Sequence, residues 1–90
     1  MALTLAGVSC VSDTDCVTVG AYFDTSPLLA RSLIARWNGA TWKPVANPQS
    51  GFPLLFGVAC VTSSSCYAVG FHGLGALQEH WDGTRWSVQT

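Results

Sequence analysis

Four cysteines and four tryptophans, each set arranged as two equal pairs, are the residues of this chain best placed to do chemistry. Six positions separate Cys10 from Cys16, and Cys60 from Cys66. If each pair flanks a hairpin turn, its Cα atoms lie about 4.5 Å apart, which permits a disulfide that adds about 2 kcal/mol of stability. Free buried thiols are a second interpretation. A four-thiolate zinc site is a third, although the spacing is wider than zinc motifs use.

The tryptophans flank two short turns, in WNGATW and WDGTRW. Asn-Gly and Asp-Gly are strong signals for tight hairpins. A two-residue loop places Trp37 diagonal to Trp42, and a four-residue loop places them directly opposite, so both rings share a face in either register. Trp81 and Trp86 follow the same rule, with Glu79 on their face. Two rings and a carboxylate could bind a sugar, whereas the commoner role of such rings is to fill the space between packed sheets.

Candidates for catalysis are few. His72 and His80 match a tyrosine and an arginine in the other half of the chain, and neither has an identifiable acid or base partner in sequence. An enzyme with a single site at one of them is a minor hypothesis. Asp13 and Asp15 resemble the start of a calcium loop, but its glycine and distal glutamate are missing, so a turn is expected. We therefore predict no catalytic residue, metal or cofactor.

Charge and hydropathy exclude several partners. The net charge is -1 with four basic residues, which gives no electrostatic surface for nucleic acid or anionic membrane. The longest apolar stretch, FPLLFGVACV, is too short to cross a bilayer. The start, MALTLAGVSC, lacks the features of a signal peptide, so the signal of an exported protein would lie outside this chain. Disulfides favour an extracellular or secreted origin.

An internal repeat positions these residues. GVSCVSDTDCVTVG returns as GVACVTSSSCYAVG at an offset of 50 positions, and LIARWNGATW returns as LQEHWDGTRW at an offset of 44. Six residues are therefore missing between the two blocks of the second copy, and we expect this difference in a loop. The chain comprises two copies of one unit, residues 1–50 and 51–90.

Each copy predicts four strands, because short runs of Val, Tyr, Phe and Trp alternate with clusters of Ser, Asp, Asn and Gly. Pro44 lacks a backbone N–H, which places the fourth strand at an edge. The first two strands are apolar on both faces, so both faces need covering. An all-β, four-stranded antiparallel unit of this kind is typical of a β-propeller blade. The predicted strands are 5–11, 16–23, 33–37, 42–45, 55–61, 66–72, 77–81 and 86–89.

These landmarks resemble the tandem β-propeller repeats of secreted bacterial proteins, written around GVSC, a second cysteine, VG and a terminal W-N/D-G-x-x-W. The resemblance covers nearly the whole chain. The WDGTRW hairpin is also similar to that of two-blade, fucose-binding propeller lectins, short chains that assemble as trimers with sugar sites between blades. That likeness implies that Trp86 and Trp42 stack on a sugar and that Glu79 assists, while Ala35 replaces the acid in the first copy.

The blade count predicts an assembly. Two blades leave one apolar face uncovered at each end, and closed propellers need about four to eight blades. Because head-to-tail contacts form rings or fibres, we predict a homotrimer with six blades, with a tetramer of eight as the alternative. The predicted function is a non-enzymatic extracellular binding or interaction scaffold formed by self-assembly. The alternative is a multivalent lectin that binds glycan through its tryptophan pairs.

Overall fold

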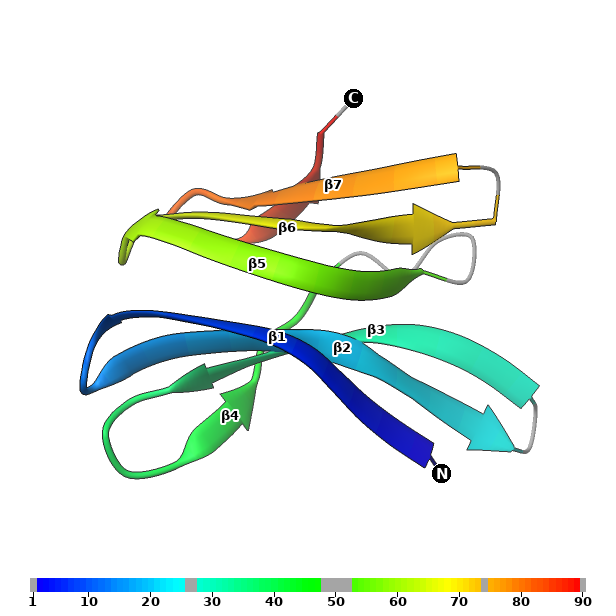
Figure 1. Ribbon diagram of the computed structural model, residues 1–90, viewed down its shortest axis with the longest axis horizontal. Coiled ribbons are helices and arrows are strands. Elements are labelled where there is room, and N and C mark those ends of the chain that lie inside the picture. Colours follow the sequence, from blue (N-terminus) through cyan, green and yellow to red (C-terminus); the bar gives the residue numbers. More distant parts are fainter. Residues whose placement is uncertain (1, 26–27, 48–52, 74, 90) are drawn as a thin grey trace.

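The chain forms two four-stranded antiparallel sheets in the computed structural model, which describes residues 2–25, 28–47, 53–73 and 75–89 (Figure 1). No helix occurs in these ranges. Each sheet is a simple meander, with order β1-β2-β3-β4 in the first sheet and β5-β6-β7-β8 in the second. The all-β class, four strands per copy and the edge position of Pro44 are confirmed. The strands are β1 (Ala2–Ser12), β2 (Asp15–Thr25), β3 (Leu28–Trp37), β4 (Trp42–Pro44), β5 (Leu54–Thr62), β6 (Ser65–His72), β7 (Gly75–Trp81) and β8 (Trp86–Val88).

The six extra residues of the first copy lengthen a hairpin. β2 and β3 stay paired from Cys16 opposite Trp37 out to Thr25 opposite Leu28. The equivalent pairing of β6 and β7 ends at His72. The prediction that the copies differ in a loop was therefore wrong. A longer ladder satisfies backbone N–H and C=O groups that a loop would leave to solvent.

Both predicted disulfides are present, Cys10–Cys16 and Cys60–Cys66, with Cα atoms 3.9 and 4.0 Å apart. The cysteines of each pair lie directly opposite each other, as predicted. The first turn comprises only two residues, because Ser12 pairs with Asp15 and the ladder shifts register between Cys10 and Ser12. The β5–β6 turn repeats this irregularity. No free thiol remains, and the two disulfides are compatible with an extracellular protein.

The hydrophobic core lies between the two sheets, which pack face to face (Figure 1). The backbones of β1 and β5 approach closely, and a Cβ on Gly7 would lie 3.2 Å from the carbonyl oxygen of Phe56. The Cys60 N–H also donates to Ser9 Oγ at 3.0 Å, which ties these two strands together. The buried core residues are Val17, Val19 and Ile34 of the first sheet and Leu55, Cys66, Ala68, Leu77 and Trp86 of the second.

Burial differs between the equivalent strands β2 and β6. Residues 16–21 of β2 are all buried. In β6, Cys66 and Ala68 are buried, whereas Tyr67, Val69 and Phe71 on the opposite face are exposed. The exposed face of β6 is the kind of uncovered apolar face that the sequence predicts at each end of a two-blade chain. The second sheet has an uncovered apolar face.

Candidate functional site

Both tryptophan pairs adopt the register of a four-residue loop. Trp37 pairs directly with Trp42, and Trp81 with Trp86. The ring centroids are 5.6 and 5.9 Å apart, with the ring planes tilted by 44° and 40°. The rings of each pair therefore share one face, as either predicted register required.

Asn38 and Asp82 select this four-residue loop. Asn38 Oδ1 accepts hydrogen bonds from the backbone N–H groups two and three residues further on, both at 2.9 Å. Asp82 Oδ1 does the same at 2.9 and 3.0 Å, and also accepts from the Thr84 hydroxyl at 2.8 Å. These hydrogen bonds favour the charged carboxylate and lower the pKa of Asp82 to about 2, and the bond from the Thr84 N–H has the largest effect. Gly39 and Gly83 complete the turns at φ values of +95° and +100°.

The two tryptophan pairs lie in different environments. Trp86 is buried between the sheets, whereas its counterpart Trp42 is exposed on the outer face of the first sheet. The other ring of each pair holds a neighbouring turn, since Trp37 Nε1 donates to the Asp13 carbonyl at 3.3 Å and Trp81 Nε1 to the Ser63 carbonyl at 3.2 Å. Of these pairs, the one in the first sheet presents an open ring to a ligand.

Glu79 lies in the junction between the sheets. It is on β7, directly between Ala68 of β6 and Val88 of β8, and its exposed fraction is 0%. Neither carboxylate oxygen has a hydrogen-bond partner among the described residues. Burial without a partner disfavours the charged form and raises the pKa of Glu79 to about 7. Glu79 thus shares the face of Trp81, as expected, but the first sheet covers that face.

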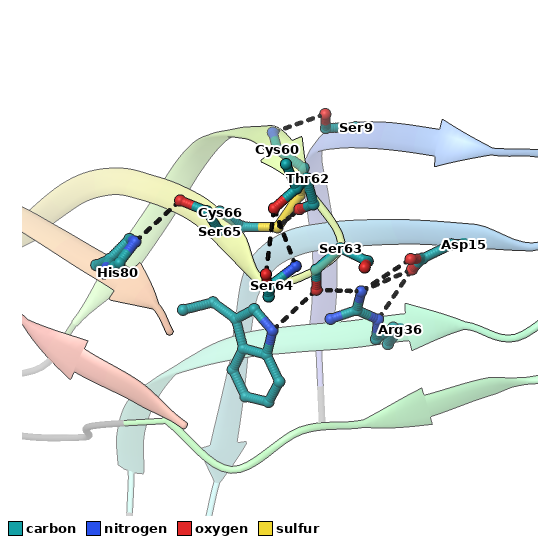
Figure 2. Close-up of a disulfide and its surroundings, with 11 residues drawn as sticks. Ser9, Asp15, Arg36, Cys60, Thr62, Ser63, Ser64, Ser65, Cys66 and His80 are labelled. Carbon is teal, nitrogen blue, oxygen red and sulfur yellow. Dashed lines mark hydrogen bonds and ion pairs between the residues drawn. A yellow bond between two sulfur atoms is a disulfide. The ribbon is translucent and has the colours of Figure 1, made fainter. Parts of the chain in front are cut away.

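A polar cluster at the edge of the same junction was missed by the sequence analysis (Figure 2). Arg36 makes a two-pronged contact with Asp15, at 2.9 and 3.0 Å. The same guanidinium donates to the Ser63 carbonyl of the second sheet at 2.9 Å and lies 5.7 Å from the centroid of the Trp81 ring. The Ser63 carbonyl therefore accepts bonds from both sheets. The sequence signal that could have revealed this cluster was the opposite charge of two residues, Asp15 at the start of β2 and Arg36 near the end of the neighbouring strand β3.

The two histidines lie at opposite ends of the β6–β7 hairpin. His72 pairs with Gly75, and His80 with Tyr67. His80 Nε2 is 3.2 Å from Ser65 Oγ, and its ring stacks on Tyr67 with centroids 4.4 Å apart. The structure does not bring the histidines together. No group of three or more metal-ligating side chains occurs in the described ranges.

An apolar hollow of about 380 Å³ opens on the outer face of the first sheet. The exposed ring of Trp42 forms part of its wall. Thr18, which lines it, donates its hydroxyl hydrogen to the Gly7 carbonyl at 2.8 Å, so this hydroxyl has no donor left for a ligand. Such a lining favours an apolar occupant. The hollow is lined by Leu5, Thr18, Leu33, Ala35, Trp42 and Pro44.

Comparison of the chain with protein-family models, with curated proteins and with solved structures gave no match. Within the described residues, no helix is both long enough and apolar enough to span a membrane.

Proposed function

We propose that this chain is a non-enzymatic β-propeller repeat module that builds an extracellular interaction scaffold by binding copies of itself. In this proposal each sheet is one blade, and three chains form a ring of six blades, with four chains and eight blades as the alternative. The observation that carries the proposal is an uncovered apolar face on the outer side of each sheet. Leu5 and Trp42 are exposed at one end, and Val69 and Phe71 at the other. Exposed apolar surface of this kind marks an interaction site.

The use of the polar side chains supports a scaffold over an enzyme. Arg36 and Asp15 bind each other, and His80 contacts Ser65. Asp82 caps its own turn. These contacts hold turns and strands in place. His72 lies at the opposite end of the β6–β7 hairpin from His80 and its partner Ser65. A catalytic site needs such groups to converge on one reacting atom.

Light scattering coupled to size-exclusion chromatography tests the proposal. The expected mass is three times that of the 9.5 kDa chain, unchanged over a range of loading concentrations. A mass of four chains would change the blade number and keep the ring. A mass of one chain, in a sample with the circular dichroism of a β protein, would overturn the proposal.

A second candidate function is a multivalent lectin, and the exposed ring of Trp42 beside the apolar hollow favours it. Aromatic rings stack on the apolar faces of sugars. A glycan array followed by Trp42→Ala tests this function, and binding should be lost in the variant. Asp13→Asn, on an exposed turn, is the control that should keep binding. An array without any signal would remove the lectin function.

A further inference from the structure

We propose that the apolar hollow of the first sheet is the socket for the exposed face of β6 in a second copy, so that chains join head to tail. Tyr67 and Val69 of one copy enter the hollow of the next. This inference rests on the proposed self-assembly and specifies its surfaces and direction. The junction between chains is then equivalent to the junction between the two sheets of one chain.

The lining of the hollow carries this inference. Each lining residue has a counterpart at the matching repeat position of the second sheet. Five of the six counterparts are buried there, and the exception is Val88, which is 45% exposed. Leu5 is 58% exposed and its counterpart Leu55 is 0% exposed; Trp42 is 46% exposed and Trp86 is 5% exposed. In the order of the lining given above, the counterparts are Leu55, Ala68, Leu77, Glu79, Trp86 and Val88. The hollow is therefore an unoccupied copy of a surface that is buried elsewhere in the chain.

The face that covers this surface is also present twice. Val17 and Val19 of β2 pack in the core, with exposed fractions of 2% and 0%. Their counterparts Tyr67 and Val69 are 40% and 50% exposed. The outer face of the first sheet thus has no sheet packed on it, and the exposed face of β6 has no sheet to pack on. Because the two ends differ, joining them is a head-to-tail contact that can close into a ring.

Two substitutions between the copies compensate each other in size. Ala35 in the hollow replaces the larger Glu79, and Tyr67 on the facing surface replaces the smaller Val17. Packed interiors tolerate exchanges that conserve total volume far better than uncompensated ones. In the proposed junction the additional bulk of Tyr67 meets a hollow that lacks the Glu79 side chain. This exchange favours a second copy of the chain over an unrelated occupant.

The edge of the junction has matching partners as well. In the chain, Arg36 reaches the Ser63 carbonyl and the Trp81 ring across the junction. The counterpart of Arg36 is His80, and those of Ser63 and Trp81 are Asp13 and Trp37. We expect His80 of one copy to lie over Trp37 of the next, near the Asp13 carbonyl. His80 is already held toward this edge by its contact with Ser65, just as Arg36 is held by Asp15.

The test uses two variants that each damage one end. Leu5→Asp places a charge in the hollow, and Val69→Asp places one on the β6 face; each variant alone should be monomeric. Mixed in equal amounts, they share one intact junction, since the undamaged β6 face of the first fits the undamaged hollow of the second. Sedimentation should then show a dimer. Val61→Asp is the matched control, because Val61 is 75% exposed and its counterpart Val11 is also exposed, so its assembly should equal that of the wild type.

The outcomes separate this inference from the proposed function. An oligomeric wild type whose two variants also stay oligomeric would keep self-assembly and overturn the head-to-tail junction. Monomeric variants that fail to pair when mixed at high concentration would likewise overturn it, as would pairing of either variant with itself. A monomeric wild type would overturn the proposed function. Should either variant fail to fold by circular dichroism, Trp42→Asp replaces Leu5→Asp and Tyr67→Asp replaces Val69→Asp.

Discussion

Replacing Glu79 with glutamine should abolish a loss of stability that the wild-type chain shows as the pH rises. The Glu79 carboxyl is fully buried without a hydrogen-bond partner among the described residues, and burial raises its pKa from 4.5 to about 7. The folded protein thus binds this proton more tightly than the unfolded chain does. The resulting stabilisation is complete below pH 4.5 and is lost as the pH rises through about 7. The interval between the two pKa values corresponds to about 3 kcal/mol.

Urea unfolding followed by tryptophan fluorescence measures this effect, at one protein concentration and at about pH 4 and pH 8. Between these conditions the wild type should lose about 3 kcal/mol more than Glu79→Gln, since all other titrating groups are common to both. That difference equals roughly 12 to 24 °C in melting temperature for a domain of this size. Asp13→Asn, which removes an exposed carboxylate, should keep the wild-type pH dependence. Equal pH dependence in wild type and Glu79→Gln would refute the reasoning and show that water reaches the carboxyl in the folded chain.

Three further predictions concern the turns and the junction. Gly39→Ala should cost about 1–2 kcal/mol, because φ is +95° there and the new Cβ would lie 2.9 Å from Thr14 Cγ2; an unchanged urea midpoint would contradict this. Arg36→Ala should cost about 1–3 kcal/mol in the same assay, since the Asp15 carboxylate and the Ser63 carbonyl lose their charged donor. Lys43→Ala, on exposed β4, is the control and should leave the urea midpoint unchanged. Reduction and alkylation of the two disulfides should cost about 2 kcal/mol of stability each. The intact mass without reductant should be four hydrogens below that of the reduced chain, and four reactive thiols in the native protein would contradict the pairing.

The local structure was largely predictable because the repeat presents each signal twice. The cysteines, the edge proline and the turn residues fixed four strands per copy and paired Cys10 with Cys16. The loop of the tryptophan hairpins was left open, since Asn-Gly is compatible with two registers. The side chain of Asn38 decides between them by accepting two backbone N–H groups at once. That preference depends on the geometry of four residues and is not visible in the Asn-Gly pair alone.

The environment of each candidate site residue was not predictable. Trp42 and Trp86 have the same local sequence context, yet one is exposed and the other buried, because only the second sheet has a neighbour over that face. Glu79 lies on the face of the rings, as the strand pattern predicts, but its lack of a hydrogen-bond partner in the described part of the chain depends on how two sheets pack. Contacts of this kind join residues far apart in sequence. Because the two copies share one strand pattern, that pattern cannot show that only the second sheet has a neighbour over this face.

The placement of the disulfides bears on how such a chain can change in length. Each disulfide closes within a single hairpin and joins cysteines six positions apart. Duplication or deletion of a whole unit therefore adds or removes two partnered cysteines and leaves none unmatched. Oxidation of one hairpin also requires nothing from the next, so every unit can complete its own covalent closure as soon as it leaves the ribosome and meets an oxidant. A gene of this kind can gain or lose units by recombination without passing through a product that carries an odd thiol.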